Sequence, residues 1–483
     1  MGKLIRIELN KIFKHKSIYI VLFIIIAFCF LNNILYRNDY DNDGFYKYEK
    51  VENLDKYIKR FSFKNKKLNI NKDSDKILYV TNKTKIDVAK IKKKYKYRDW
   101  RYIKANDYLY DNIYNCNYHK YISNDENELI LCKKDFEKKY KKFKINNWVY
   151  FLKKEKKSLY DREKNVNDEI KNTSDLKLKE TLNEEKDNID IDLKIINYRL
   201  KKKISYGDNY LNRSLLEYRQ NINVENNRGN LSKIDYYNKL SSYYVNKYII
   251  DNKTNVNKVN TLNYQLRNIV DDYELFIVLI ILITVSIIIG EEFNKGTIKL
   301  LLIKPFSRSK ILLSKYISCF IMILLTIMFV FVINFFVGSL FFGIDSLKNG
   351  VVVYSFNLHK VLKINIFLYV LMRVVAKIPM FIIIETLGIL LGIVLTNTIS
   401  SFSITMLLYT FSEVINKIAI NYKLKFMKYF ITLNWNFRDY LFGGFTEYPY
   451  VNLKNSMLIF IIYVIIFMGV MFKAFERKDI KNI

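Results

Sequence analysis

The sequence predicts an all-α membrane protein with six transmembrane helices and one large, mainly helical extracytoplasmic domain. Two features of the 483-residue chain carry this prediction. Its mean hydropathy is close to zero because strongly apolar runs are balanced by one long polar block, 36–272. The apolar runs are long enough to cross the hydrocarbon core of a bilayer, which takes about 20 residues of helix.

Six apolar runs have the length and composition of transmembrane helices. They lie at 17–35, 273–290, 316–342, 378–395, 399–418 and 457–472. A cleaved signal peptide is the alternative interpretation of the first run, but no small-residue cleavage site follows it. We therefore expect an uncleaved first span and a chain held in the lipid bilayer.

The N-terminal residues 1–16, MGKLIRIELNKIFKHK, have the pattern of an amphipathic helix. Ile5, Leu9, Ile12 and Phe13 fall on one face at helical spacing. The basic residues fall mostly on the opposite face. A helix of this kind lies on a membrane surface with its apolar face toward the lipid. We expect it to be a cytoplasmic interface helix.

Short basic segments indicate the orientation of the chain. They are the N-terminal helix, the turn 291–315 and the tail 473–483. Lys and Arg in short loops favour the cytoplasmic side, and six crossings place all three segments there. Both termini are then cytoplasmic, and 36–272 is extracytoplasmic in a cell membrane. The outer loops are expected at 343–377, with an amphipathic segment, and at 419–456.

The polar block contains two apolar stripes at heptad-like spacing, on either side of the turn NTSD at 172–175. The first consists of Ile145, Trp148, Leu152, Leu159, Val166 and Ile170. The second consists of Leu182, Ile189, Leu193, Ile196 and Leu200. Because each stripe needs an apolar partner, the pattern predicts an antiparallel helical hairpin at about 145–204. A charged, partly disordered loop is the alternative.

The four cysteines are too few for a disulfide scaffold. Cys29 and Cys319 fall in apolar runs and are expected to be packing residues. Cys116 and Cys132 lie in the polar block, and they could form a disulfide if that block is outside the cell, where conditions are oxidising. Two free thiols are the other interpretation.

The composition argues against several classes of function. The net charge of +32 can indicate nucleic acid, but the basic excess is spread over both parts of the chain, so we expect no such partner. Cys116, His119 and Cys132 are too few ligands for a metal site. None of the fourteen glycines belongs to a phosphate-binding loop, and no catalytic Ser/His/Asp set is visible. We therefore expect neither enzyme activity nor a cofactor.

Three ionisable residues in or before the fourth span are candidates for a translocation path. Glu385 lies inside the span, while Arg373 and Lys377 precede it in the segment LMRVVAKIP. Ionisable groups at membrane depth are costly, and they usually face a cavity or a partner. The alternative is structural, with these charges satisfied between helices or at the interface.

The turn between the second and third spans reads GEEFNKGTIKLLLIKPFSRSKILLSKY. Glu291 and Glu292 would stand in the first turn of a helix, where carboxylates suit the positive end of the dipole. The apolar face of that helix would consist of Phe293, Thr297, Leu300 and Leu301. Pro305 would end it. A short amphipathic helix parallel to the membrane suits the docking of a soluble partner; a basic loop held by lipid headgroups is the alternative.

This turn resembles the segment after the second span of ABC-2 type permeases, the membrane subunits of ATP-binding-cassette exporters. The pattern of that family is an acidic residue, an aromatic or apolar residue, Gly-Thr, paired leucines, Pro and Arg. The matching residues here are Glu292, Phe293, Gly296, Thr297, Leu300, Leu301, Pro305 and Arg308. The N-terminal LIRIELNKIFKHKSIYI and the ending FKAFERKDI are similar to that family as well. The departure is 36–272, since many members have only a short loop there.

The resemblance implies the permease subunit of an exporter, without ATPase activity of its own. Two such subunits, in a homodimer or heterodimer, pair with separate ABC ATPase subunits, and the residues of the turn form the coupling contact. The cargo would be a peptide, antibiotic, lipid or other amphiphile, and 419–456 would form short re-entrant helices. The alternative is a membrane-anchored surface receptor or structural protein that uses the same spans without a transport cycle.

Overall fold

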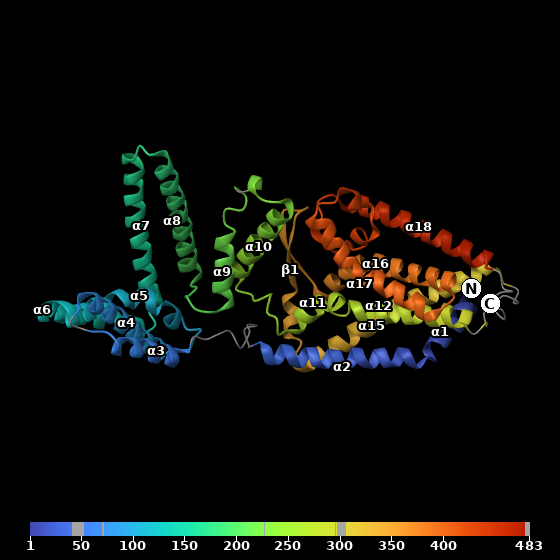
Figure 1. Cartoon of the computed structure of the whole chain (residues 1–483), viewed down its shortest axis with the longest axis horizontal. Coiled ribbons are helices and arrows are strands. Elements are labelled where there is room, and N and C mark those ends of the chain that lie inside the picture. The colour runs from blue at the N-terminus through green and yellow to red at the C-terminus, as the bar shows by residue number, and fades with distance from the viewer. Residues whose placement is uncertain (41–52, 70–71, 227, 295, 297–305, 479–483) are drawn as a thin grey trace. The chain divides into compact units, whose positions relative to one another are not determined.

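The computed structural model describes the chain except for 41–52, 70–71, 227, 295, 297–305 and 479–483. The described residues are helical almost throughout, and they contain one two-stranded antiparallel sheet (Figure 1). Within the described part of the chain, six helices are long and apolar enough to cross a membrane. These findings confirm the predicted all-α membrane fold with six spans.

The chain divides into two compact units, which we call the membrane unit and the polar unit. The membrane unit consists of Met1–Lys47, Arg228–Ser241 and Val256–Ile483. The polar unit consists of Tyr48–Asn227 and Ser242–Asn255, and it lies within the polar block expected between the first two spans. Each unit is described by itself below.

The membrane unit is a helical bundle preceded by a short N-terminal helix, α1 (Gly2–Phe13). Its candidate spans are α2 (Lys16–Asp39), Glu274–Asn294, α15 (Arg308–Phe342), α16 (Ile366–Leu395), α17 (Thr398–Asn421) and α18 (Leu453–Arg477). The second of these is made of α12 (Glu274–Val285), the π-helical turn η3 (Ser286–Gly290) and α13 (Glu291–Asn294). A further helix, α11 (Leu262–Asp272), precedes α12.

The bundle has a buried centre and a more exposed rim. In the most apolar stretch of Glu274–Asn294, 61% of the residues are buried, and in that of α16, 56% are buried. The corresponding share is only 17% in α17 and in α18. Because the exposed residues of these helices are mainly apolar, the rim suits contact with lipid chains. Glu274–Asn294 and α16 therefore form the centre of the bundle.

Side-chain caps set the beginnings of the spans. Ser307 accepts a hydrogen bond from the backbone of Lys310 at the start of α15, and Asn365 does the same for Phe367 at the start of α16. Both helices consequently begin earlier than the apolar runs 316–342 and 378–395. Arg373 and Lys377 thus belong to the same continuous helix as Glu385, and not to a separate amphipathic segment.

Among the connections between spans, the hairpin after α15 was not predicted from the sequence, whereas short helices were expected within 419–456. Strands β1 (Val351–Ser355) and β2 (Lys360–Ile364) pair antiparallel, with Val351 opposite Ile364. After α17 come three 3₁₀ segments, η5 (Lys425–Tyr429), η6 (Ile431–Leu433) and η7 (Phe437–Gly443). The β-branched run VVV after Gly350 was the signal for the hairpin.

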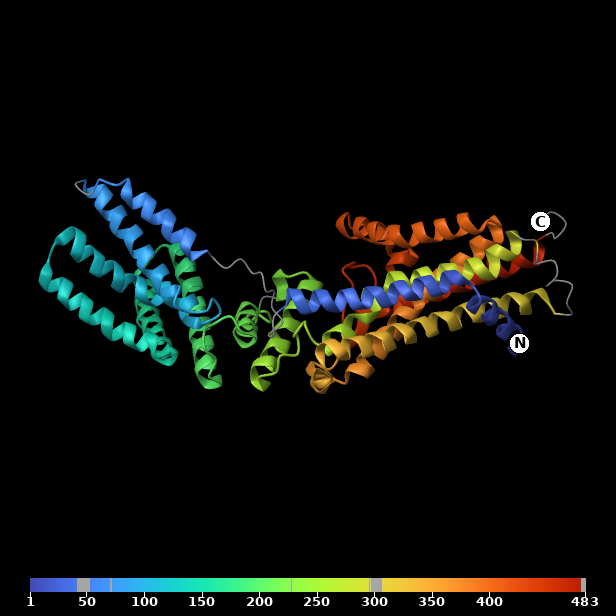
Figure 2. The same cartoon turned by 90° about the horizontal axis from the view of Figure 1, so that it is seen from below.

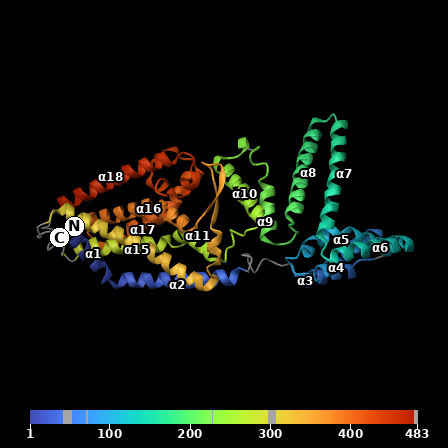
Figure 3. The ribbon, with the colours of Figure 1, turned by 180° about the vertical axis from the view of Figure 1, so that it is seen from behind.

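The polar unit is helical, as predicted. It holds α3 (Leu54–Lys66), α4 (Asp73–Lys92), α5 (Trp100–Tyr118), η1 (His119–Ser123), α6 (Glu126–Lys144), α7 (Trp148–Asn172), α8 (Leu176–Lys202), α9 (Tyr210–Gln220) and the second half of α10 (Lys233–Asn252). Helices α7 and α8 stand side by side as an antiparallel hairpin (Figures 1 and 3), which confirms the prediction at 145–204. Between them, Asp175 caps α8 by accepting from Lys177 and Leu178.

The two predicted heptad stripes match the apolar contact along most of the hairpin, but they do not match it at the start of α7. Leu159, Val166, Ile170, Leu182, Ile189 and Leu193 form one apolar cluster between the two helices. Trp148 instead packs in the neighbouring cluster around Trp100 and Phe151. Ile145 is 64% exposed because it caps α6 and lies in the turn before α7, outside the helical register.

Cys116 and Cys132 form a disulfide between α5 and α6. Of the two interpretations that the sequence left open, the structure therefore has the pair and not the free thiols. Cys29 and Cys319 are free and buried within the membrane unit.

Candidate functional site

A cluster of buried charges joins α1 to the ends of two spans. The ammonium of Lys315 lies 2.8 Å from Oε1 of Glu8 and 2.6 Å from Oε2 of Glu292. It also donates to the backbone oxygen of Ile288 at 3.1 Å. The Lys315 side chain is fully buried, and those of Glu8 and Glu292 are 4% and 5% exposed. One cation thus holds two carboxylates that come from separate helices.

Two further ion pairs extend this cluster. Lys11 lies 2.6 Å from Oε1 of Glu292, so that carboxylate is shared between two cations. His15 lies 2.8 Å from Oε1 of Glu291. We call Glu8, Lys11, Glu292 and Lys315 the ion cluster. Lys11 is 33% exposed, whereas the other three charges are taken out of water, which is costly unless they pair well. The cluster therefore fixes α1 against α13 and α15 in one arrangement.

The buried face of α1 is not quite the stripe predicted from the sequence. Ile12 is fully buried and Leu9 packs against the bundle core, but Phe13 is 42% exposed and Ile5 is only half-buried. The most buried positions are Leu4, Glu8 and Ile12, at four-residue spacing. A stripe defined by apolar residues could not include Glu8, because its partner Lys315 comes from a distant part of the chain.

The residues that flank the coupling segment lie at this same end of the bundle. Phe293 is buried and meets Phe475 of α18 edge to face, with ring centroids 6.4 Å apart. Asn294 donates to Thr398 at 2.6 Å. Arg308 donates to the backbone oxygen of Glu476 at 2.5 Å. In Figure 2 the N-terminus is marked at this end.

The C-terminal residues complete the contact. Lys478 donates to the backbone oxygens of Ile393 and Val394 at the end of α16, and its ammonium lies 5.6 Å from the ring centre of Phe293. Burial lowers the pKa of the Lys478 amine from its ordinary value. The three segments that the resemblance singled out, the N-terminal helix, the turn and the ending, therefore meet through side chains.

Part of the predicted coupling segment lies outside the described residues. Thr297, Leu300, Leu301 and Pro305 fall in 297–305, and so does most of the predicted amphipathic helix. Gly296 is described, with a φ of +66°, a conformation that favours glycine. The carboxylates Glu291 and Glu292 do not stand free at a helix start, because His15 and the ion cluster hold them.

The three candidates for a translocation path do not form one group. Arg373 and Lys377 belong to an ion-pair network with Asp271 and Glu274, in which Arg373 pairs with Asp271 and Lys377 with Glu274. Arg438 joins it at 2.9 Å from Oδ1 of Asp271. Arg373 and Lys377 are therefore paired with charges on neighbouring elements, the arrangement that the structural interpretation expected. They link α16 to α11, α12 and η7.

Glu385 is different, because both oxygens of its buried carboxyl lack a hydrogen-bond partner among the described residues. It lies on the buried face of α16, two helical turns beyond Lys377. Its electrostatic neighbours include Tyr316 and Cys319 of α15. The Tyr316 hydroxyl is 3.1 Å from the hydroxyl of Thr386, the residue after Glu385.

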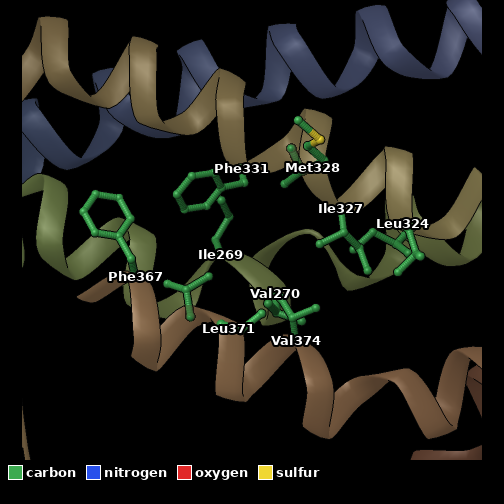
Figure 4. A pocket seen from close by; sticks show the side chains of 12 residues that line it. Ile269, Val270, Leu324, Ile327, Met328, Phe331, Phe367, Leu371 and Val374 are labelled. Carbon is green, nitrogen blue, oxygen red and sulfur yellow. The ribbon is translucent and has the colours of Figure 1, made fainter. Parts of the chain in front are cut away.

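An apolar pocket of about 290 Å³ lies between α11, α12, α15 and α16. Figure 4 shows Ile327 and Phe331 of α15 approaching Val374 and Leu371 of α16, with Val270 of α11 between them. Several of its lining side chains, such as Met328 at 64%, are also exposed on the outside of the bundle. A pocket without polar lining groups suits an acyl chain or another apolar group.

The fold and these contacts define a multi-pass membrane protein whose N-terminal helix is joined to its spans by buried charges. The chain belongs to the family described as "Protein of unknown function (DUF2705)", which matches residues 233–481. It is similar to the "Uncharacterized protein YhcI" of Bacillus subtilis (strain 168), with 27% identity over 222 residues. That alignment covers 45% of this chain and 70% of the relative. No solved structure matches the chain.

The family match covers the last five spans and leaves out α1, α2 and most of the polar unit. It therefore includes Glu292 and Lys315 but not Glu8 or Lys11. Neither the family description nor the name of the relative states an activity.

Proposed function

We propose that the chain is the permease subunit of an ATP-driven exporter of the ABC-2 type and that a separate subunit hydrolyses the ATP. The observation that carries the proposal is the ion cluster. In such a transporter, movement of a soluble subunit must be transmitted to the spans. This requires a rigid connection between the docking surface and the spans. The three buried charges of Glu8, Glu292 and Lys315, with the partly exposed Lys11 paired to Glu292, provide such a connection, because separating them would leave charges unpaired in a low-dielectric site.

Exposed apolar side chains on α1 and just before α15 support docking of a soluble partner. Ile7 and Phe13 of α1 are 53% and 42% exposed, and Phe306, just before α15, is 42% exposed. The motif residues 297–305 connect this surface to α13. A partner that binds here would push on α1, α13 and α15 together, since the ion cluster links all three.

The cargo of the proposed exporter is an amphiphile. The apolar pocket between α15 and α16 would accept the apolar part of such a molecule, and its exposed edge would admit it from the bilayer. Glu385 is the one residue of the earlier candidate path that keeps this role in the proposal, because its buried carboxyl has no partner among the described residues.

The proposed orientation places both termini in the cytoplasm and the polar unit outside the cell. The disulfide between Cys116 and Cys132 supports this, because such bonds persist in oxidising compartments and are rare in the cytosol. An ATPase subunit would bind at the cytoplasmic end, where Lys11 of α1 meets Glu292. The complete exporter would contain two permease subunits.

Co-purification tests the proposal. Tagged protein is isolated from gently solubilised native membranes, and the eluate is assayed for ATPase activity and for a subunit with a phosphate-binding loop. We expect both, and we expect Leu300→Asp with Leu301→Asp to remove them. Leu358→Asp is the matched control, because Leu358 is 57% exposed between β1 and β2 and should tolerate the charge. Recovery without any ATPase, under conditions that preserve a known transporter complex, would favour the receptor or anchor.

A further inference from the structure

A small pocket of about 190 Å³ lies where η5 meets the start of α18. One basic and one aromatic side chain come from η5, while α18 supplies one amide and two aliphatic side chains. With one tyrosine from just before α18, the lining residues are Lys428, Tyr429, Tyr450, Asn455, Leu458 and Ile459. The proposed coupling uses none of them. The pocket therefore joins a polar connection to the apolar surface of a span.

A buried asparagine fixes η5 against α18. The amide nitrogen of Asn434 donates to the backbone oxygens of Lys428 and Phe430, at 2.8 and 2.7 Å. Its amide oxygen accepts from the hydroxyl of Ser456 at 2.9 Å, and both residues are buried. Because Asn434 uses both ends of its amide, Lys428 is held beside the first turn of α18. The pocket is therefore a built feature of the fold.

Two ammonium groups lie at the pocket without an ion pair. The Lys428 ammonium lies 4.8 Å from the ring centre of Tyr429, and that of Lys425 lies 6.0 Å from the ring centre of Tyr450. Neither lysine has an ion pair within the part of the chain that the structure describes. A contact with the face of a ring uses no oxygen acceptor, so both ammonium groups keep N–H donors for a ligand.

The charge of the connection 419–456 is positive once its ion pair is set aside. Arg438 pairs with Asp439 at 3.3 Å. The other carboxylate of this connection, that of Glu447, lines a different pocket, of about 390 Å³. The other cations are four lysines, Lys423, Lys425, Lys428 and Lys454. Four cations against one carboxylate favour an anionic ligand at η5.

The other side of the pocket faces lipid chains. Leu458 is 59% exposed, and Ile461 and Ile462, farther along α18, are 53% and 44% exposed. These residues belong to a candidate span, where the exposed surface meets hydrocarbon. Phe426 and Tyr429 of η5 are 63% and 60% exposed, and aromatic residues of this kind gather at the membrane interface. The pocket thus lies at the depth where a lipid headgroup continues into its acyl chains.

We propose that this pocket binds an anionic phospholipid, with its phosphate at Lys428 and Lys425 and an acyl chain along Leu458. The two ammonium groups match a phosphate that carries no positive partner of its own. A zwitterionic headgroup brings a cation, which the four lysines repel, so phosphatidylcholine binds less well. A soluble phosphate ester lacks the chain that would cover Leu458. The inference does not depend on the transport function, because binding needs neither the ATPase nor ATP.

The test uses the purified full chain in nanodiscs that contain phosphatidylglycerol and phosphatidylcholine in equal amounts. Lipids that stay bound when the protein is released from the nanodiscs are counted by native mass spectrometry. We expect phosphatidylglycerol to be preferred by about tenfold or more. Soluble glycerophosphoglycerol is then added in excess as a competitor, and we expect it not to displace the lipid. Displacement would show that the headgroup suffices, and it would overturn the assignment of a lipid.

Four variants test the assignment to this pocket. Lys428→Gln should lower the preference about fivefold, and Lys425→Gln with Lys428→Gln should lower it further. Lys428→Arg keeps the charge and should keep the preference. Lys360→Gln is the control, since it removes an exposed lysine of β2, in another connection between spans and outside the lining. Equal retention of the two lipids by the native protein would overturn the proposal, as would a Lys428→Gln effect no larger than that of Lys360→Gln.

Discussion

The Lys315 ammonium and the Glu292 carboxylate are 2.6 Å apart, and neither side chain is more than 5% exposed. Lys315 belongs to α15 and Glu292 to α13, while the second carboxylate on Lys315, Glu8, belongs to α1. The pair therefore lies at the junction of three helices. Its integrity should govern both the stability of the bundle end and the proposed coupling.

Lys315→Met should destabilise the protein strongly. The substitution keeps the length of the side chain but leaves Glu8 and Glu292 facing each other without their shared cation. Breaking a buried ion pair in this way typically costs about 3–5 kcal/mol. Thermal unfolding in a fixed detergent measures the effect. Lys310→Met is the matched control, because Lys310 is exposed on the same helix and has no ion pair within the described residues. Equal stability of the two variants would contradict the role given to Lys315.

A double variant separates loss of the cation from loss of packing. In Lys315→Met with Glu8→Leu, one of the stranded carboxylates is removed as well, and Lys11 still pairs with Glu292. Replacing both partners of a buried pair by apolar groups is often close to neutral. We therefore expect the double variant to recover part of the stability that Lys315→Met loses. No recovery would mean that packing at Lys315, and not its charge, holds α1.

Glu385→Gln should keep or raise thermal stability while it lowers ATP turnover by the proposed complex. Burying a carboxyl without a partner costs free energy, so a neutral amide relieves part of that cost. Glu413→Gln, at an exposed position of α17, should change neither property. A fall in stability would indicate a structural partner for Glu385. Unchanged turnover of the Glu385 variant would reject its place in a translocation path.

Replacing Cys116 and Cys132 together by serine should destabilise the polar unit by about 3 kcal/mol, because the disulfide closes a loop across a sequence separation of 16. Urea unfolding, followed by tyrosine and tryptophan fluorescence, measures this loss. Peptide mapping without reductant should also recover the two cysteines as one linked pair. Alkylation of both thiols in unreduced native protein would contradict the pairing.

Accessible single cysteines test the orientation. Ser158→Cys on α7 should react with a membrane-impermeant maleimide added to intact cells, whereas Lys14→Cys should react only after permeabilisation. Both positions are exposed, so differences in labelling report the side of the membrane. The reverse pattern would place the polar unit in the cytoplasm and would remove the proposed docking end.

The sequence predicted the spans and the hairpin because both depend on local periodicity. Leu159 and Val166, for instance, show their shared face through spacing alone. The sequence analysis missed contacts in which a residue is held by a partner from a distant part of the chain. Glu8 interrupts an apolar stripe, yet it is buried because Lys315 pairs with it, and no local pattern could indicate that. Likewise, Arg373 and Lys377 were grouped with Glu385 by nearness in sequence, whereas their partners are Asp271 and Glu274.

Capping explains a second kind of difference. Hydropathy locates the apolar part of a span, but Ser307 and Asn365 start α15 and α16 well before it. The first turns of both helices therefore include polar residues that precede the apolar run, such as Arg308 and Arg373. The polar pocket of about 390 Å³ lined by Asn416, Thr432 and Glu447 gave no signal, since its lining comes from separate segments that only the fold brings together.

The most direct test of the proposed coupling is site-specific photocrosslinking in native membranes. A photoreactive residue at Phe306, just before the helix α15 that carries Lys315, should capture an ATPase subunit identified by its phosphate-binding loop. The same photoreactive group at Phe426, which is exposed in η5, should not capture the ATPase. Capture of the ATPase at Phe306 alone would support the permease account. Absence of an ATPase at Phe306, or equal capture from Phe426, would contradict it.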